Sequence, residues 1–460
     1  MEESGVWNWM GILDSIDGFI WGVPMLILLM GTGLLLTVRL RLLQVSKLPR
    51  ALKLIFTAEN AGEGDVTSFK SLCTALAATI GVGNIVGVAT AITAGGPGAL
   101  FWMWLAAFLG IATKYAEGLL SVKYRVVDAK GQISGGPMRY IELGLGDKFR
   151  PLAIMFAVFG ACAGILGIGT TTQAQAIISA CKGAFEIPEA VSASILAVVV
   201  AVVILGGLQS ISTVASKIVP FMSVLYFVFG VGIIILKIHQ IPDAIVLVVK
   251  SAFNGHAALG GFGGAAFASA IRNGVARGIF SNEAGLGSAP IASAAAKTHW
   301  PAEQGLISMT GTFIDTMVIC TITGLSLVVT GAWTGPSRGA LMTQDAFRAV
   351  YPDSGPYIVT LCLMLFAFTT ILGWAYYGER CVSYLMGTKA TLPYRLGWVA
   401  MVAIGPFLPL DVVWLVADIT NGLMAFPNLV ALIGLSGIVV AETKKYFDHL
   451  AGKKTEEEDA

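Results

Sequence analysis

The chain alternates long apolar segments with short polar loops. A helix that crosses the hydrocarbon core of a bilayer needs about 20 mainly apolar residues, and most of these segments approach or exceed that length. The pattern predicts an all-α polytopic membrane protein with eleven spans, over residues 20–38, 68–94, 97–122, 149–181, 190–206, 217–237, 262–297, 305–331, 355–383, 394–409 and 411–441.

Basic residues in the loops predict how these spans are oriented. The segment 39–53 after the first span carries five Lys and Arg residues and no acid, whereas the N-terminus before that span is acidic. The loop 123–150 is also basic, and the tail contains Lys444, Lys445, Lys453 and Lys454. Because cytoplasmic loops are enriched in Lys and Arg, we expect a cell-membrane protein with its N-terminus outside and its C-terminus in the cytoplasm.

Two of the predicted spans are interrupted at mid-depth. Segment 68–94 contains Gly81-Val82-Gly83-Asn84 in its middle, and segment 262–297 contains Phe280-Ser281-Asn282-Glu283 followed by further glycines. Because lipid offers no hydrogen bonds to freed backbone groups, such a break is tolerated only where it lines a cavity. Broken helices at corresponding positions in two halves of a chain are typical of transporter binding sites.

The order of the two breaks predicts how the chain is divided. With the first span set aside, the interrupted segments are the first and the sixth of the remaining ten, as expected for two inverted repeats of five helices. We expect an extra N-terminal helix with its basic loop in 1–60, the first repeat in 61–240, the second repeat in 241–441 and a charged tail in 442–460.

Composition agrees with a membrane transporter and excludes other classes. The chain is 56% hydrophobic and 12% charged, whereas soluble proteins contain about 25% charged residues. A net charge of +1 without a stretch rich in Lys and Arg predicts no nucleic-acid partner. The sequence has no metal-ligand spacing, no G-x-x-x-x-G-K-[ST] motif and no Ser/His/Asp set at depth, so we expect neither an enzyme nor an ATP-driven pump.

The first break offers backbone groups of both polarities. Two half-helices that meet at the membrane midplane direct carbonyls and amides at one point, which suits a zwitterionic amino acid and a cation. We expect amides near Gly83–Ile85 to bind a carboxylate, and carbonyls of Ala78 to Gly81 to face a cation. The Asn84 amide is expected at either ligand; alternatively, it hydrogen-bonds to a neighbouring helix.

Polar residues also gather at the second break. We expect Phe280 to form a wall of the pocket and Asn282 to bind substrate or sodium. Ionisable residues at membrane depth mark ion or proton pathways, which makes Glu283 a candidate. The alternative for Glu283 is a salt bridge to Arg272 or Arg277.

Two further spans carry polar residues within apolar sequence. Gln173 and Gln175 lie in segment 149–181, and because residues two apart do not share a helix face, we select Gln175 as the ligand. Asp315 follows the second broken helix in segment 305–331, where it either assists a cation site or is held in structural hydrogen bonds.

Two segments resemble a known transporter family. Gly95–Gly110 reads GGPGALFWMWLAAFLG and closely resembles the signature of the sodium:alanine symporter family, also called alanine or glycine:cation symporters. The stretch Gly274–Pro290, GVARGIFSNEAGLGSAP, is similar to that family as well. The resemblance implies a leucine-transporter-like fold within the amino acid-polyamine-organocation superfamily, and uptake of alanine and glycine coupled to sodium or, in some members, protons.

The same resemblance implies where sodium binds. In the leucine-transporter fold a sodium ion lies between carbonyls of the first core helix and adjacent hydroxyls of the eighth, and Thr369 and Thr370 look like that pair. Next to them we expect Ile371 and Trp374 to line the small substrate pocket. Alternatively, the threonines bond to carbonyls of their own helix and Trp374 only packs.

These observations predict a sodium-coupled symporter of small neutral amino acids, alanine or glycine, that works by alternating access in contact with membrane lipid. The sequence leaves two alternatives. One is a proton-coupled symporter of the same substrates that uses Glu283 or Asp315, and the other is a passive facilitator or channel.

Overall fold

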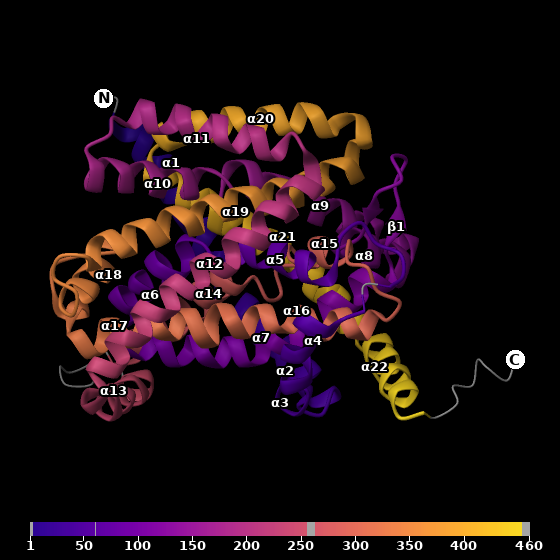
Figure 1. Cartoon of the computed structure of the whole chain (residues 1–460), viewed down its shortest axis with the longest axis horizontal. Coiled ribbons are helices and arrows are strands. Elements are labelled where there is room, and N and C mark those ends of the chain that lie inside the picture. Colours follow the sequence, from indigo (N-terminus) through magenta and orange to yellow (C-terminus); the bar gives the residue numbers. More distant parts are fainter. Residues whose placement is uncertain (1–2, 60, 255–262, 453–460) are drawn as a thin grey trace, which may run out of the picture.

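The computed structural model describes residues 3–59, 61–254 and 263–452. Most of these residues are helical, and the strands β1 (Val126–Val127) and β2 (Ile133–Ser134) form the single sheet within these three ranges. Figure 1 shows many of the long helices running side by side along the long axis of the molecule.

Helices follow one another along the chain with short connections. The first half contains α1 (Glu3–Ile20), α2 (Val23–Arg39), α3 (Leu43–Ser46), α4 (Leu48–Thr57), α5 (Ser68–Thr79), α6 (Val88–Gly95), α7 (Gly98–Lys123), α8 (Pro137–Leu145), α9 (Arg150–Leu166), α10 (Thr171–Phe185), α11 (Glu189–Ile204) and α12 (Gly207–Leu236). The second half contains α13 (Ile241–Asn254), α14 (Gly263–Asn282), α15 (Pro290–Ser293), α16 (Pro301–Thr312), α17 (Thr321–Thr330), α18 (Ala340–Arg348), α19 (Gly355–Met386), α20 (Thr391–Ile404), α21 (Leu410–Gly434) and α22 (Ser436–Leu450). The segments Gly83–Gly87 and Phe313–Cys320 are π-helical. Short 3-10 turns occupy Asp147–Phe149, Ile238–Gln240, Ala332–Thr334, Thr388–Ala390 and Gly405–Phe407.

The chain is a predominantly helical, multi-pass membrane protein. Within the described ranges, seven helical segments are long and apolar enough to cross a bilayer, and eight if the bent pair Ser68–Thr79 and Gly83–Gly95 counts as one span. The remaining three of the eleven predicted spans fall on α11 with 16 residues, on α14, which ends at Asn282, and on α20 with 14 residues. Length and composition alone therefore support seven or eight spans.

The predicted interruption of the first broken helix is confirmed. Helix α5 ends at Thr79, the next two residues are not helical, and the two halves are bent by 51°. A Cβ atom at Gly81 would lie 2.5 Å from Oγ1 of Thr370, and one at Gly373 would lie 2.8 Å from the amide nitrogen of Ala78. Glycines on both helices thus let α19 approach the break closely.

The second interruption lies later than the sequence predicted. Helix α14 continues through Asn282, so Phe280 is helical and the break begins at Glu283. The φ angles of Glu283, Gly285 and Gly287 are 57°, 89° and 82°. Because glycine adopts such left-handed conformations without steric cost, Gly285 and Gly287 allow the chain to stay unwound after Glu283.

Two buried side chains of α7 hold this unwound segment. Nζ of Lys114 donates to the carbonyl of Asn282 at 2.8 Å, where the negative end of the α14 dipole favours a cation. Oε1 of Glu117 accepts hydrogen bonds from the amides of Gly285 and Gly287 at 3.1 and 3.2 Å. Charges of opposite sign therefore bind the carbonyl and amide groups that the break sets free.

Different segments build the two ends of the molecule. In Figure 1, α13 and α18 lie at the left-hand end, and β1, α8 and α22 lie toward the right-hand end. Between the ends, α7 packs against α14 and α16, and α19 packs against α5, α9 and α12. The second break is thus held by α7, and the first is contacted by α19.

Candidate functional site

Asn84 links the first break to the helix that follows the second. Its Oδ1 accepts a hydrogen bond from the amide of Gly81 at 2.8 Å, and its Nδ2 donates to Oδ1 of Asp315 at 2.7 Å. The carbonyl of Asn84 accepts a hydrogen bond from Oγ1 of Thr323 at 2.8 Å. The bond to a neighbouring helix, which was the alternative for Asn84, is therefore present.

Asp315 connects this arrangement to the end of α14. While one carboxylate oxygen accepts from Asn84, the other accepts from the hydroxyls of Ser281 at 2.8 Å and Thr316 at 2.7 Å. Asn282 donates its Nδ2 to Oγ1 of Thr316 at 3.0 Å. Since Asp315 is fully buried, its position depends on both broken helices at once.

The two threonines of α19 point in different directions. Oγ1 of Thr370 lies 3.4 Å from the carbonyl oxygen of Ile80 at the first break, and it also bonds to the carbonyl of Phe366 at 3.0 Å. Thr369 bonds to carbonyls of its own helix and lies 3.5 Å from the sulfur of Met222 on α12. Of the expected pair, only Thr370 has a hydrogen bond to the first break among the described residues, whereas Thr369 makes the bonds within its own helix that were the alternative for both threonines.

Glu283 is bound by neutral donors. Nε1 of Trp374 donates to its Oε1 at 2.7 Å, and Oγ of Ser288 donates to its Oε2 at 2.6 Å. Arg272 and Arg277 pair instead with Asp17 and Asp418, at 3.3 and 2.8 Å. The predicted alternative of a salt bridge from Glu283 to either arginine is therefore wrong.

A cavity of about 900 Å³ leads to the first break. Its lining extends from the exposed Arg338 and the residues of α18 to Val82. Gln175 lines this cavity, and its Oε1 has no hydrogen-bond partner among the described residues. Gln173 is not among the residues that line the cavity, and its Oε1 accepts a hydrogen bond from the amide of Val82 at 3.3 Å. Of the two glutamines, only Gln175 lines the cavity, and its unpaired Oε1 is itself buried.

An aromatic and ionic stack borders this cavity. The ring of Phe280 lies 5.4 Å from that of Trp414, and the Arg277 guanidinium lies 5.6 and 5.5 Å from these two rings. The two terminal nitrogens of the Arg277 guanidinium, Nη1 and Nη2, donate to the two carboxylate oxygens of Asp418 at 3.2 and 2.8 Å. Trp414 lines the main cavity and also a second one of about 740 Å³ that contains Arg277 and Asp418. The stack therefore lies where the two cavities meet.

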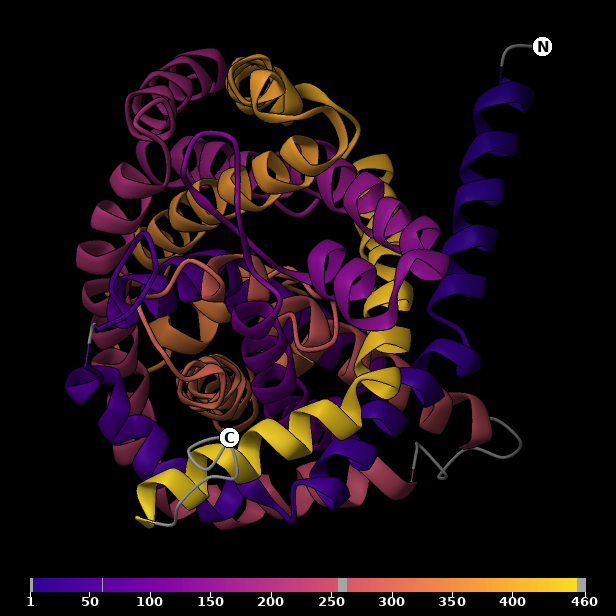
Figure 2. The same cartoon turned by 90° about the vertical axis from the view of Figure 1, so that its right-hand side faces the viewer.

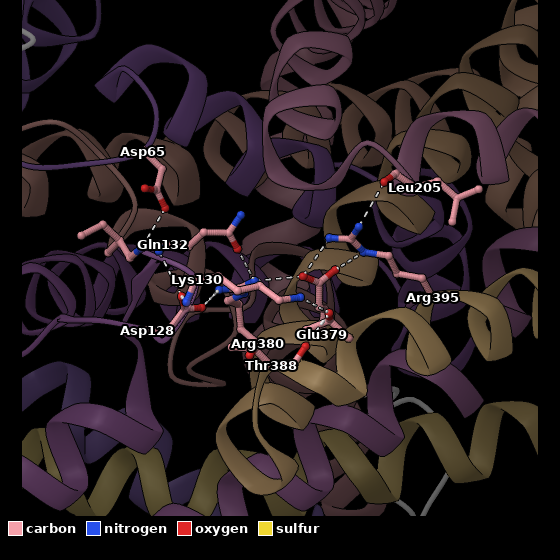
Figure 3. Close-up of polar contacts among 11 residues, drawn as sticks. Asp65, Asp128, Lys130, Gln132, Leu205, Glu379, Arg380, Thr388 and Arg395 are labelled. Atoms are coloured by element: carbon pink, nitrogen blue, oxygen red, sulfur yellow. Dashed lines mark hydrogen bonds and ion pairs between the residues drawn. The ribbon is translucent and has the colours of Figure 1, made fainter.

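A polar network centred on the buried Glu379 and Arg380 lies toward the β1 end of the molecule (Figure 3). Arg380 bonds to Asp128 at 3.0 Å, to Gln132 at 2.9 Å and to Glu379 at 2.9 Å. Arg395 donates to Glu379 at 2.6 and 3.0 Å. We refer to these residues, together with Asp65, as the Arg380 network.

Asp65 ties the chain before α5 to this network. Its Oδ2 accepts from the amide of Ile133 at 2.9 Å, and its carbonyl accepts from Nε2 of Gln209 at 2.6 Å. Burial raises the pKa of the Asp65 carboxyl, and the Ile133 amide and the Arg380 guanidinium oppose that rise. The network thus joins the chain before the first broken helix to β2, α12 and α19.

Comparison with known proteins identifies the family. The sodium:alanine symporter family model matches residues 7–460. This chain belongs to the sodium:alanine symporter family. It is accordingly a membrane transporter and not an enzyme.

Relatives of this symporter are similar over nearly their whole length. An uncharacterized transporter of Haemophilus influenzae is 58% identical over 441 residues, which cover 95% of this chain and 96% of the relative. The sodium/alanine symporter AgcS of Methanococcus maripaludis is 48% identical over 447 residues, which cover 95% of this chain and 97% of that protein.

A solved structure shows the same fold. The crystal structure of MhsT in complex with L-phenylalanine matches with a TM-score of 0.60 at 11% sequence identity, covering 83% of this chain and 93% of MhsT. At this identity the likeness concerns the fold alone. It agrees with the leucine-transporter-like fold that the sequence of this symporter implied.

Several prominent residues of the symporter did not emerge from its sequence. Trp414 lies in an apolar span, where a tryptophan is unremarkable, and the pairing of Arg277 with Asp418 joins residues 141 positions apart. A signal for the Arg380 network was present, since Glu379 and Arg380 are adjacent opposite charges within a long apolar segment. Charged residues in such segments are rare and mark functional positions.

Proposed function

We propose that this protein is a secondary active transporter that couples the entry of alanine or glycine to that of sodium. The observation that carries the proposal is the cavity that ends at Val82, next to unwound backbone inside a membrane protein. A zwitterion in such a place needs partners for both of its charges, since an unpaired charge away from water costs several kcal/mol. Free amides and carbonyls at a helix break supply both kinds of partner.

The proposed substrate site lies between the first break and α10. The carboxylate binds at the backbone amides beyond Val82, near Gly83–Ile85, where the Asn84 amide now donates to the carbonyl of Gly81 at 3.2 Å and exchanges that bond for the ligand. Gln175 lines the same cavity. Phe280 and Ile371, both buried, restrict the side chain to a methyl group or a hydrogen. The side chains of Asn282 and Trp374 are already bonded to Thr316 and Glu283, so we propose that they support the pocket wall.

Two positions are proposed for sodium. The first lies between Oγ1 of Thr370 and the backbone carbonyls from Ala78 to Gly81, because Thr370 already lies close to the carbonyl of Ile80. The second lies at the carboxylate of Asp315 beside Asn84, where a buried negative charge favours a cation. Thr369 is left out of the proposed site because its hydroxyl, unlike that of Thr370, has no hydrogen bond to a carbonyl of the first break among the described residues.

The proposed membrane topology has eleven spans. It adds α11, α14 and α20 to the eight segments of sufficient length, and the two broken helices then head two inverted repeats in 61–240 and 241–441, after an extra helix in 1–60 and before a tail in 442–460. The N-terminus is proposed to lie outside the cell membrane and the C-terminus in the cytoplasm. The basic segment 39–53 and loop 123–150 support that orientation.

Alternating access requires that the two ends open in turn. The main cavity is lined at one end by α18 and the loop before it, which is outside in this topology, while the Arg380 network joins segments at the other end. We propose that sodium and substrate enter from the α18 side. The Phe280–Trp414–Arg277 stack then closes over them, and the Arg380 network separates to release them into the cytoplasm.

A proton-coupled mechanism is the second candidate. Its supporting observation is that Glu283 receives hydrogen bonds from Trp374 and Ser288, both neutral, and pairs with neither Arg272 nor Arg277. The cation that interacts with it is the buried Lys114 of α7. A passive facilitator is disfavoured by the Arg380 network, which is buried and joins segments far apart in the chain.

Coupling to sodium is energetically sufficient. A sodium ion that moves down a potential of about 100 mV gains ~2.3 kcal/mol, and a tenfold concentration gradient adds ~1.4 kcal/mol. Because each ~1.4 kcal/mol is a factor of ten, one ion can sustain a gradient of about 400-fold.

The test is uptake of labelled alanine, glycine and leucine into liposomes that contain the purified protein. We expect alanine and glycine to accumulate with an inward sodium gradient, and leucine to be excluded. Accumulation driven by a pH gradient in sodium-free buffer would favour the proton mechanism. Counterflow that is independent of both ions would overturn coupled transport altogether.

A further inference from the structure

Helix α4 presents a cationic and aromatic face. Its buried residues Ala51 and Ile55 lie on the side that packs against α16. The opposite side exposes Arg50, Lys53 and Phe56, and Phe56 is 82% exposed. Because residues three apart are neighbours on a helix surface, these three side chains share one face.

Helices α4 and α22 lie across the direction of the spans. In Figure 2, which views the molecule along its long axis, α22 (yellow) and α4 (dark purple, lower left) are seen from the side, whereas α16 is seen end-on. Nζ of Lys47 lies 4.7 Å from the centre of the Phe447 ring, and the Arg50 guanidinium lies 5.9 Å from that of Tyr446. Residues 39–57 and α22 therefore form one surface, which we call the basic platform.

The basic platform has an excess of positive charge. Residues 39–57 contain five cations and no acid, namely Arg39, Arg41, Lys47, Arg50 and Lys53. Within the described part of the chain, Arg41 and Lys53 form no salt bridge. The acid Glu303 interacts electrostatically with Arg50 and offsets part of its charge.

Apolar side chains accompany these cations. Leu42 and Val45 are 51% and 56% exposed, and they follow Leu34 and Val38 of α2, which are 54% and 66% exposed. An exposed apolar surface that continues from a spanning helix into a basic, transverse helix is typical of the boundary between lipid tails and headgroups. The platform thus begins where α2 leaves the hydrocarbon region.

We propose that the basic platform binds the headgroup of an anionic phospholipid in the leaflet where α2 ends. Lys53 and Arg50 meet the phosphate, and Phe56 enters the region of the acyl chains. A zwitterionic lipid offers no net charge to these cations, whereas juxtamembrane Lys and Arg residues gain about 1 kcal/mol each near an anionic surface. In the proposed topology this is the cytoplasmic leaflet.

The position of the platform gives the lipid a role in transport. Residues 58–67 connect α4 directly to α5, the first half of the first broken helix, and this connection contains Asp65 of the Arg380 network. A lipid that holds α4 at the leaflet therefore also restrains the N-terminal end of α5, which moves in the proposed transport cycle. The lipid site itself is independent of the substrate and of the coupling ion.

The experiment measures lipid binding to the purified full-length protein in detergent by native mass spectrometry. Phosphatidylglycerol and phosphatidylcholine of equal chain length are titrated against the wild type, Arg50→Gln/Lys53→Gln and a matched control. The control, Lys237→Gln/Lys250→Gln, removes two positive charges beside and within α13, at the other end of the molecule. We expect phosphatidylglycerol to bind the wild type and the control equally, and the platform variant about 30-fold more weakly, from ~1 kcal/mol per charge and ~1.4 kcal/mol per tenfold.

Four results would overturn the proposal. The two lipids could bind equally well, the control variant could lose as much binding as the platform variant, or inorganic phosphate alone could displace phosphatidylglycerol. A dimer that disappears only in the platform variant would instead assign this face to a second copy of the chain. Phe56→Ala leaves both cations in place and is expected to weaken retention of the lipid but not its preference for the anionic headgroup. Because no step depends on uptake, a negative result here is distinct from failure of sodium-coupled transport.

Discussion

Nδ2 of Asn84 and Oδ1 of Asp315 lie 2.7 Å apart, and this hydrogen bond joins the first broken helix to the helix that follows the second. The other oxygen of Asp315 accepts a hydrogen bond from Ser281 at the end of α14, so one carboxylate is hydrogen-bonded to residues at both breaks. In the proposed mechanism, a ligand that shifts either break changes the hydrogen bonds of the other. Such a shared contact is a physical basis for the coupling free energy between ion and substrate.

Asp315→Asn is predicted to lower sodium-dependent alanine uptake at least about tenfold. Asn84 and Ser281 both donate to the Asp315 carboxylate, and the NH2 group of the substituted Asn cannot accept a hydrogen bond from one of them. Each buried group left without a partner costs about 1–3 kcal/mol. Uptake is measured in liposomes, and the melting temperature is measured in detergent. Glu189→Gln, which removes a carboxylate from the exposed pair with Lys182, serves as the control and is expected to change neither quantity. Normal sodium activation in Asp315→Asn would exclude Asp315 from the ion site.

Thr370→Ala is predicted to raise the sodium concentration for half-maximal uptake about tenfold, while Thr369→Ala leaves it unchanged. Only the Thr370 hydroxyl lies close to the carbonyl of Ile80, and the loss of one oxygen ligand to a cation is of the order of 1.4 kcal/mol. The neighbouring threonine is the matched control because its hydroxyl points to Met222. The two variants are compared in sodium titrations of alanine uptake. Equal shifts in both would contradict the proposed site.

The position of the first break could be predicted because its signal is local. Gly81 and Gly83 beside the polar Asn84 in the middle of an apolar segment have few explanations in lipid, and the structure has the break there. The second break was predicted too early. The polar residues Ser281 and Asn282 indicated the break, but both are still helical, and the left-handed backbone begins at Glu283 and continues at Gly285 and Gly287.

Partners in space were harder to predict than positions in sequence. Glu283 is bonded to Trp374, 91 residues away, and Arg277 to Asp418, 141 residues away, and no periodicity encodes which charge meets which. The direction of the Thr369 hydroxyl depends on the rotation of α19 about its axis, which the apolar segment 355–383 leaves undefined because it is apolar on all sides.

Arg380→Gln is predicted to reduce the steady-state accumulation of alanine about tenfold or more while retaining exchange. Removal of the guanidinium leaves Asp128 and Glu379 without one partner, and breaking a buried ion pair costs about 3–5 kcal/mol. That cost falls on the state in which the network is closed, so the inward-open population increases. Accumulation under a sodium gradient and counterflow at equal sodium are measured in the same liposomes.

Lys123→Gln is the control for this network variant. It removes a cation from the partly exposed pair with Glu442, and surface pairs are worth about 0–1 kcal/mol. We expect normal accumulation. If accumulation and counterflow fell together in Arg380→Gln, the residue would serve folding or binding and not closure.

Gly81→Ala is predicted to destabilise the protein and abolish uptake, and Thr370→Ala is predicted to restore part of its stability. The added Cβ would lie 2.5 Å from Oγ1 of Thr370 and 3.3 Å from Oε1 of Gln173, and overpacking of this kind costs about 1–3 kcal/mol. Gly87→Ala is the matched control because nothing lies within 4 Å of a Cβ at that position. Melting temperatures of the single and double variants form a double-mutant cycle, in which residues in contact show a coupling energy. A strictly additive cycle would mean that α19 does not touch the first break at Gly81, and the sodium position proposed between them would be lost.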